Sequence, residues 1–296
     1  MARKKKAITV PLETIGTIPD ATWERLQLIL APTYPPKPTG RGRIDFRKAI
    51  DGIIFRLRTG CQWHHLPKIF GDDSSVHRWF QRWVDDAIFV QLWAILLEEC
   101  DALAGVEWQW QAVDGCLGKA RFGGKKTGPN PTDRGKSGTK KSLAVEGAGG
   151  PLGVVIAGAN VPDVQLLEQT LEAIVIDRPE VTQEEPQHLC LDKGYDQPLG
   201  HKVVAQTDYT PQSRPLKEKE ENLPPKDQRQ PARRWVVERT LAGLQKGRGI
   251  LIRYDKKEKN YWGLIQLACA LIWFRRLDRF YACADSTRKC NFAFYG

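Results

Sequence analysis

The hydrophobic pattern of this 296-residue chain changes its period near Trp108, and that change limits the folds open to the chain. Upstream, apolar residues recur at the three- and four-residue spacing of helices. Downstream, short apolar runs alternate with helical segments. Residues 44–106 are therefore predicted to be all-helical and residues 107–280 to form an α/β unit. The stretch 1–43, which ends in a Pro- and Gly-rich run, is interpreted as an arm and linker, and residues 281–296 as a loose tail without a clear period.

The order of elements after Trp108 predicts how the second unit is built. The expected elements, in order, are strands over 108–114, 141–146 and 152–157, a helix over 163–173, a strand over 188–191, a helix over 199–206, a strand over 208–210, a charged loop over 213–232 and helices over 233–246 and 261–276. Three strands followed by alternating helices and strands predict a mixed five-stranded sheet. The sheet has a hairpin at one edge, parallel strands beside it and flanking helices.

Charge and composition narrow the class of partner. The chain has 45 Lys and Arg against 35 Asp and Glu, a net charge of +10, which favours a polyanion. The most apolar run, 264–274, is shorter than the roughly 20 residues that a spanning helix needs, so no membrane partner is expected. The N-terminus has a basic start without the apolar core of a secretory signal, and the seven cysteines include no CxxC pair, so a cytoplasmic protein with reduced thiols is predicted.

Three acidic residues stand out against this basic background. Asp114 and Asp192 each follow a predicted strand, and Glu238 is the only acid in the predicted helix over 233–246. If the two strands are neighbours, the two carboxylates face one crevice, where a divalent cation would relieve their repulsion, and oxygen ligands suit Mg²⁺ or Mn²⁺. Taken singly, each Asp could be a turn residue or a helix cap, and Glu238 could be an i,i+4 partner of Arg234.

Basic segments flank these acids. Residues 119–141 hold eight Lys or Arg against one acid, and residues 230–280 hold twelve against four. Acids in a crevice within basic, Gly-rich segments favour metal ions acting on a phosphodiester. The candidates for phosphate contacts are Arg134, Lys136, Lys140, Arg234 and Lys246. For any one of them, an ordinary solvated surface position is an equal alternative.

The helices before residue 106 could bind DNA. A helix, a short helix and a further helix with an outward polar face are consistent with a helix-turn-helix. Its candidate base-reading residues are Ser75, His77, Arg78, Gln81 and Arg82. The alternative is a plain helical bundle with a solvated polar face, and the tryptophans Trp63, Trp79 and Trp83 are expected in the core.

Long motifs in the chain resemble a known family. The stretches AVDG, PTDRGKSGTKKSLAVEGAGGPLGVVIAGAN, LDKGYD and RRWVVERTLAGLQKGRGILIRYD resemble DDE transposases of bacterial insertion sequences, in the insertion sequence four and five superfamily and closest to family five. The resemblance implies a ribonuclease H-like fold and a catalytic, metal-binding triad of Asp114, Asp192 and Glu238 that holds two Mg²⁺ or Mn²⁺ ions. Two positions depart from the family signature: Pro231 stands where a Tyr is usual, and Gln245, followed by Lys246, where a Lys is usual.

The resemblance favours one function over two others. A transposase would bind the terminal inverted repeats of its element, cleave the double-stranded DNA and join the ends to a target, and synapsis of two ends makes a homodimer the expected assembly. A metal-dependent nuclease of the same fold would cut without joining. A catalytically decayed DNA-binding protein or repressor would bind without cutting.

Overall fold

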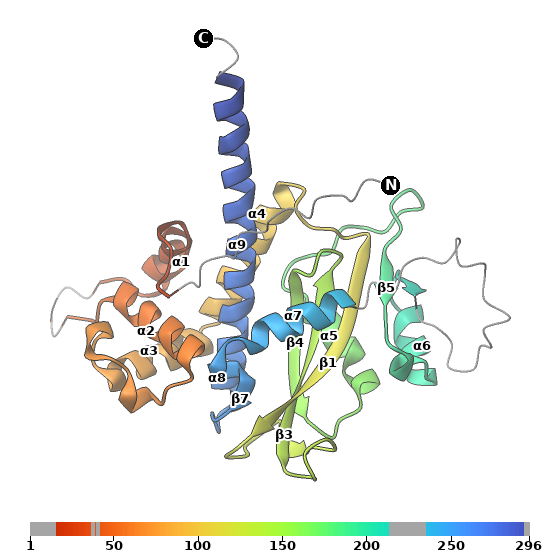
Figure 1. Cartoon of the computed structure of the whole chain (residues 1–296), viewed down its shortest axis with the longest axis horizontal. Helices are drawn as coiled ribbons and strands as arrows, with labels where there is room; N and C mark the ends of the chain where they lie inside the picture. The colour runs from red at the N-terminus through yellow and green to blue at the C-terminus, as the bar shows by residue number, and fades with distance from the viewer. Residues whose placement is uncertain (1–15, 37–38, 40–41, 213–234, 293–296) are drawn as a thin grey trace, which may run out of the picture.

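The computed structural model describes residues 16–36, 39, 42–212 and 235–292, with the side chains of 282–292 excepted. Four helices come first and a mixed sheet follows, as the change of period near Trp108 predicts (Figure 1). The helices are α1 (Asp20–Thr33), α2 (Phe46–Thr59), α3 (Asp73–Asp85) and α4 (Ile88–Ala102), and two 3-10 turns, η1 (Trp63–His65) and η2 (Lys68–Phe70), separate α2 from α3.

Local side-chain chemistry explains where α2 and α3 begin and end. The Asp45 side chain accepts hydrogen bonds from the backbone N–H groups of Arg47 (2.9 Å) and Lys48 (3.2 Å), and Asp72 accepts one from Ser75 N–H (2.9 Å). Helix α2 stops at Gly60, whose φ of +69° is a conformation that favours glycine. Both capped helices lie within residues 44–106, which were predicted to be all-helical.

Both ends of the chain are more helical than expected. Helix α1 lies inside the stretch 1–43 that was interpreted as arm and linker, and its inner face buries Leu26, Ile29 and Leu30. The last helix, α9 (Glu258–Phe292), was expected to end at residue 276, with a loose tail from 281, but it continues through that tail to Phe292. In Figure 1, α9 passes beside α4 and extends beyond the rest of the molecule.

Five strands follow one another across the sheet in the order β4–β3–β1–β5–β6. Strands β1 (Trp110–Ala120), β3 (Ser137–Glu146) and β4 (Pro151–Gly158) are antiparallel neighbours, and β5 (His188–Cys190) and β6 (Thr210–Gln212) lie parallel to β1. Two further two-residue strands among the described residues extend the sheet: β2 (Gly128–Pro129) pairs with β3 and β7 (Ile252–Arg253) with β1. The expected ribonuclease H-like mixed sheet is therefore confirmed.

Strand β1 is longer than predicted. It was expected to end at Asp114, but it pairs with β3 as far as Lys119 and with β7 at Lys119 and Ala120. The sequence GCLGKA after Asp114 has weak apolar alternation, so its strand conformation comes from pairing on both sides rather than from its own pattern. Asp114 consequently lies in the middle of a strand.

Helices cover both faces of the sheet. On one face, η3 (Asp163–Leu166) and α5 (Leu167–Glu172) pack through Thr170, whose hydroxyl donates to Ser142 Oγ on β3 (2.8 Å). On the other face, α7 (Trp235–Gln245) crosses β1 and β3, and Tyr261 of α9 meets the adjacent β3 residue, Lys141 (Nζ to Oη 3.2 Å) (Figure 1). Successive residues of a strand point to opposite faces, so Ser142 and Lys141 mark the two faces. The remaining elements are η4 (Lys193–Tyr195), α6 (Pro198–Ala205) and α8 (Arg248–Leu251).

One apolar cluster joins the helices to the sheet. The indole N–H groups of Trp93 on α4 and Trp273 on α9 both donate to the carbonyl of Pro151 at the start of β4 (3.1 and 2.7 Å). Among the tryptophans expected in the core, Trp83 is fully buried, whereas Trp63 and Trp79 are half-buried and pack against the cluster. The helical part is therefore packed onto the sheet through α4 and α9.

Candidate active site

The register of the sheet brings the chain segments that carry Asp114 and Asp192 side by side. Ala112 on β1 pairs with Cys190 on β5, and each aspartate lies two residues further along its chain. On the other side of β1, Asp114 pairs with Leu143, which has the same orientation as Lys141. Because side chains alternate along a strand, Asp114 belongs to the face of the sheet that α7 covers.

Both aspartates are half-buried and have backbone partners. One Asp114 carboxylate oxygen accepts a hydrogen bond from the N–H of Gly115 (2.7 Å). Asp192 lies just beyond β5, where its carboxylate caps η4 by accepting from Lys193 N–H (2.7 Å). Asp192 is therefore a helix cap, as the alternative interpretation predicted. A cap can also be a metal ligand, because its carboxylate has further lone pairs.

Tyr195 anchors the loop that carries Asp192. Its side chain is buried, with 2% exposure, and Gly200 of α6 lies so close to the Tyr195 carbonyl that a side chain at position 200 would overlap it. Burial raises the pKa of the Tyr195 phenol, and the charges of Asp163, Asp114 and Asp192 raise it further. The three aspartates are thus near enough to one phenol to act on it electrostatically.

A fourth acid, Asp163, lies against β1 on the opposite face. Its carboxylate forms an ion pair with Lys140 Nζ (2.7 Å), and it occupies the space that a side chain at Gly115 would fill. Lys140 was predicted to contact DNA phosphate, but it is 6% exposed and its ammonium group is paired with Asp163. Asp163 was predicted only to begin a helix. The glycine immediately after Asp114 is the signal that could have indicated a close neighbour.

Glu238 lies in the first turn of α7, on the helix side that is exposed, while Val236, Val237 and Leu241 bury the other side. Because α7 packs on β1 and β3, Glu238 shares a face of the sheet with Asp114. Within the described part of the chain, no three His, Cys, Asp or Glu side chains are arranged to hold a metal ion together. The donor chemistry of the triad, carboxylate oxygen only, suits hard divalent cations.

The predicted base-reading residues of α3 divide into two groups. Arg78 and Arg82 are exposed, and Arg82 lies over the Trp79 ring (5.0 Å). The other three are half-buried and contact other residues of the protein. The N–H of Ser75 donates to the Asp72 cap. The ring of His77 stacks on Trp63, with 4.4 Å between ring centroids, and is hydrogen-bonded to the Gln81 side chain at 3.1 Å. The structure therefore leaves the two arginines most accessible on this helix.

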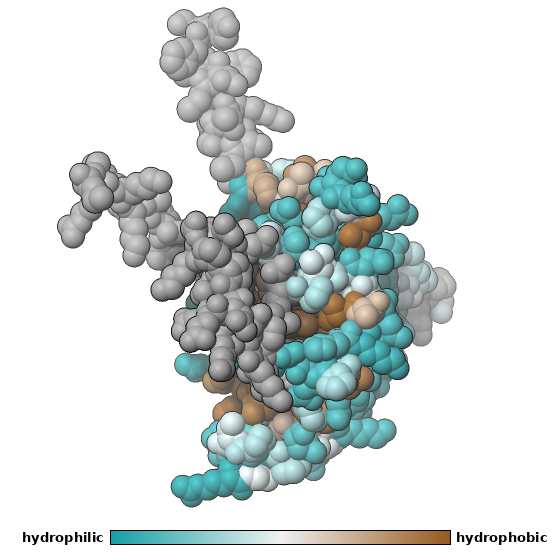
Figure 2. Space-filling model, turned by 90° about the vertical axis from the view of Figure 1, so that its right-hand side faces the viewer, coloured by the Kyte–Doolittle hydropathy of each residue, from teal (hydrophilic) through white to brown (hydrophobic). Residues whose placement is uncertain are grey.

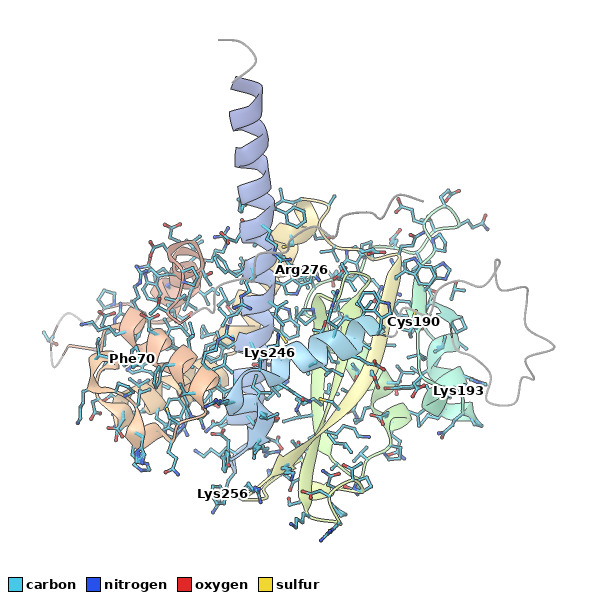
Figure 3. The ribbon with its side chains drawn as sticks, in the orientation of Figure 1. Phe70, Cys190, Lys193, Lys246, Lys256 and Arg276 are labelled. Carbon is cyan, nitrogen blue, oxygen red and sulfur yellow. The ribbon has the colours of Figure 1, made fainter. Side chains whose placement is uncertain are left out.

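Of the remaining phosphate candidates, Arg134, Lys136 and Lys246 are exposed, and Arg234 lies outside the described residues. Lys246 lies where α7 meets the helical part, far from Lys193, which follows Asp192 at the other end of the sheet (Figure 3). Gln245, at the family's usual Lys position, is half-buried in the last turn of α7.

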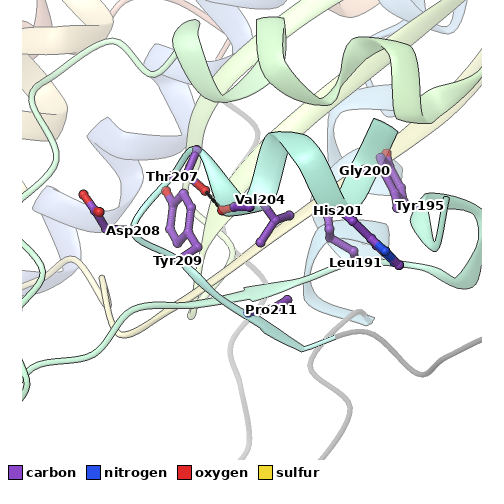
Figure 4. Close-up of a pocket in the computed structure, with 10 residues that line it drawn as sticks. Leu191, Tyr195, Gly200, His201, Val204, Thr207, Asp208, Tyr209 and Pro211 are labelled. Carbon is purple, nitrogen blue, oxygen red and sulfur yellow. Dashed lines mark hydrogen bonds between the residues drawn. The ribbon is translucent and has the colours of Figure 1, made fainter. Parts of the chain in front are cut away.

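A cleft of about 640 Å³ opens beside the Asp192 loop (Figure 4). Leu191, Val204, Tyr209 and Pro211 give it a largely apolar lining, and the Tyr209 hydroxyl donates to Gln111. The molecular surface on the side of β5 and α6 is mainly hydrophilic, with apolar side chains gathered near its middle (Figure 2). Tyr195 of the Asp192 loop also lines this cleft, but none of the three predicted catalytic acids does.

Comparison with known families agrees with this geometry. A family model described as "Transposase DDE domain" matches residues 110–273, and one described as "Putative transposase of IS4/5 family" matches residues 18–93. The chain belongs to the DDE transposases of the IS4/5 type, enzymes that act on DNA and whose catalytic domains generally use divalent metal ions.

Two relatives from Burkholderia cepacia share sequence with the chain. It is 32% identical over 168 residues to the "Putative transposase for insertion sequence element IS402", which covers 54% of this chain and 74% of that protein. It is 30% identical over 118 residues to an uncharacterized 16.2 kDa protein of the same element, covering 38% and 80% of the two chains. Among the described residues, no helix is both long enough and apolar enough to cross a membrane.

Proposed function

We propose that this transposase binds the terminal inverted repeats of its element, cleaves the DNA there and joins the freed 3′ ends to a target, using Asp114, Asp192 and Glu238. The observation that carries the proposal is the register of β1 and β5. Ala112 of β1 pairs with Cys190 of β5, each two residues before an aspartate, and α7, which carries Glu238, packs on β1 and β3; these contacts support a common site for the three acids. In this proposal residues 1–43 are an arm and linker, 44–106 the DNA-binding domain, 107–280 the catalytic domain and 281–296 a tail.

The three carboxylates would hold two Mg²⁺ or Mn²⁺ ions. Such ions lower the pKa of a bound water or hydroxyl and stabilise the charge that develops on the oxygens of the phosphodiester. Asp114 would supply its carboxylate from the middle of β1, Asp192 from the loop that follows the neighbouring β5, and Glu238 from the first turn of α7. Tyr195 would keep the Asp192 loop docked, because its side chain is buried and Gly200 of α6 packs against its carbonyl.

DNA would be held at two places. Arg78 and Arg82 on the exposed side of α3 would enter a groove of the element end, where arginine can bond base edges or phosphates. The exposed Arg134, Lys136 and Lys246 would contact phosphates nearer the catalytic face. Two element ends must be brought together for transposition, and a homodimer would supply one site to each end.

A strand-transfer assay tests the proposal. The substrate is a duplex that carries the inverted repeat bordering the gene, with a labelled 3′-hydroxyl end, and the target is a supercoiled plasmid in Mg²⁺. The wild-type chain is expected to cut the repeat and to give labelled plasmid, whereas Asp114→Asn, Asp192→Asn and Glu238→Gln should bind the duplex without either product. Glu98→Gln, an exposed acid on α4, is the matched control and should retain both activities.

The products separate the alternatives. Cleavage without labelled plasmid would indicate a nuclease of the same fold. Binding without cleavage by the wild-type chain would indicate a decayed DNA-binding protein, and wild-type activity in the Asp114→Asn variant would refute the proposed triad.

A further inference from the structure

Two exposed aromatic rings lie side by side at the junction of the helical part and the sheet. Phe122, beyond the end of β1, is 59% exposed and Tyr254, beyond the end of β7, is 46% exposed. Their ring centroids are 5.8 Å apart in an edge-to-face arrangement. Large apolar rings on a surface lose stabilisation that burial would give, so a rigidly held exposed pair is a candidate for binding.

The two rings line one side of a cleft of about 770 Å³. Its other side is formed by Gln62, Trp63 and His64 from the turn between α2 and α3. This volume lies within the range of about 300–1,000 Å³ that is usual for ligand pockets. The cleft therefore has room for a group of the size of a nucleotide, between the candidate DNA-binding helices and the catalytic sheet.

A buried arginine holds the two aromatic loops together. The guanidinium of Arg253, which is 1% exposed, donates to the carbonyls of Lys125 (2.8 Å) and Lys126 (3.2 Å) in the Phe122 loop. It also donates to the carbonyls of Asp255 (3.0 Å) and Lys256 (3.3 Å) next to Tyr254. Since one planar group with five donors bonds both loops, the spacing of the two rings is fixed in advance of any ligand.

The helical wall of the cleft is tied to the same loops. Arg56 of α2 bonds both carboxylate oxygens of Asp255 (3.1 and 3.0 Å) and lies over the Trp63 ring at 4.6 Å. Both partners of this ion pair have side chains only 7% exposed. The cleft is therefore a preformed feature that unites the two parts of the chain.

The surroundings of the rings are cationic. Five exposed basic side chains occupy the two aromatic loops, and Lys256 marks their outer tip in Figure 3. They are Arg121, Lys125, Lys126, Lys256 and Lys257. Against them, the cleft lining includes two acids, Asp255, which is paired with Arg56, and the half-buried Asp73. Aromatic faces among lysines and arginines are the arrangement with which proteins bind unpaired nucleic acid.

We propose that Phe122 and Tyr254 form a stacking site for unpaired nucleotides of the DNA substrate, with the surrounding Lys and Arg on the flanking phosphates. A base within an intact duplex has both faces covered by its neighbours, so only an unpaired or extruded base can stack on these rings. The stacking site is distinct from the triad. It rests on the proposed function only in taking the DNA of the element as its ligand.

The test compares single-stranded with double-stranded DNA in the absence of metal. The probes are fluorescein-labelled oligothymidylate of 12 nucleotides and a 12-base-pair duplex, titrated by anisotropy. The variant Phe122→Leu/Tyr254→Leu keeps apolar bulk but removes both π faces, and it should weaken binding of the single strand at least tenfold while changing duplex binding less than twofold. Phe280→Leu, which replaces an exposed ring on α9, should leave both affinities unchanged.

Equal loss on the two probes, or no loss on the single strand, would overturn the stacking site. Because the replaced rings are exposed, the double variant should have the melting temperature of the wild-type chain. An unchanged melting temperature shows that a change in binding does not come from unfolding. Because the binding assay contains no metal, it has no cleavage step and scores the stacking site without the activity of the triad. The stacking site and the catalytic proposal can therefore fail independently.

Discussion

Replacing Gly115 with alanine should destabilise the chain through one identified contact. A Cβ at position 115 would overlap the Asp163 carboxylate, with its Cγ only 3.1 Å away. Non-bonded carbons prefer about 3.5–4.0 Å, and the overlapping oxygen is closer still, so the carboxylate must move by roughly 1 Å and disturb its ion pair with Lys140. Overpacking of this kind costs about 1–3 kcal/mol of unfolding free energy.

Urea unfolding of single and double variants measures this contact. Asp163→Ala alone should also destabilise, because Lys140 loses its partner. Gly115→Ala/Asp163→Ala should be more stable than the sum of the two single changes predicts, by about 1 kcal/mol or more, because the overlap is gone. Gly118→Ala on the same strand is the milder comparison, since its nearest neighbour, the Lys141 ammonium at 3.3 Å, need shift by only a few tenths of an ångström. Strict additivity, or equal stability of the Gly115 and Gly118 variants, would refute the reasoning.

Three further predictions concern the helical part. Arg56→Ala should lower the unfolding free energy by about 3–5 kcal/mol in urea titrations, because it leaves the buried Asp255 carboxylate unpaired, and a loss below about 1 kcal/mol would contradict this. Burial and the charge of Arg56 lower the pKa of His77 in the folded chain. In the unfolded chain the pKa of His77 is near 6.5, so below that pH the unfolded chain binds a proton more readily than the folded chain does. The free energy of unfolding should therefore fall as the pH drops below about 6.5. His77→Gln should flatten this loss in melting curves from pH 8 to 5, and an unchanged slope would exclude His77 as its source. Arg78→Ala/Arg82→Ala should reduce the log–log salt slope of duplex binding by about 0.9 for each phosphate contact removed, and an unaltered slope would show that α3 does not touch the backbone.

The sequence predicted the strand order because each strand after Trp108 carries its own apolar run and turn signals. It did not predict α1, since the proline-rich stretch that suggested a linker begins inside that helix, at Ala31 and Pro32. Nor did it predict the length of α9, whose last turns carry no apolar stripe of helical period. An apolar pattern predicts the part of a helix or strand that is buried. It does not predict a part that forms because a helix continues beyond its buried turns or because a strand pairs with its neighbours.

The candidate site was accessible from the sequence only in part. Asp114, Asp192 and Glu238 could be named because motifs surround them, but the pairing of β1 with β5, which brings the segments carrying the two aspartates together, is encoded by no local pattern. Lys140 was named for its charge alone, and its partner Asp163 lies 23 positions away, on another element. The role of Lys140 is therefore set by an ion pair between distant positions, which composition does not reveal.

Iron-directed cleavage of the protein itself tests the central claim that three distant segments converge on one metal site. Fe²⁺ replaces Mg²⁺ or Mn²⁺ in oxygen-ligand sites, and with ascorbate and peroxide it generates radicals that cut the polypeptide next to the bound ion. We expect cuts near residues 114, 192 and 238 together in the wild-type chain, all suppressed by excess Mg²⁺ and by Asp114→Asn. Cuts confined to one of these segments, or cuts that persist in the Asp114→Asn variant, would contradict a shared site.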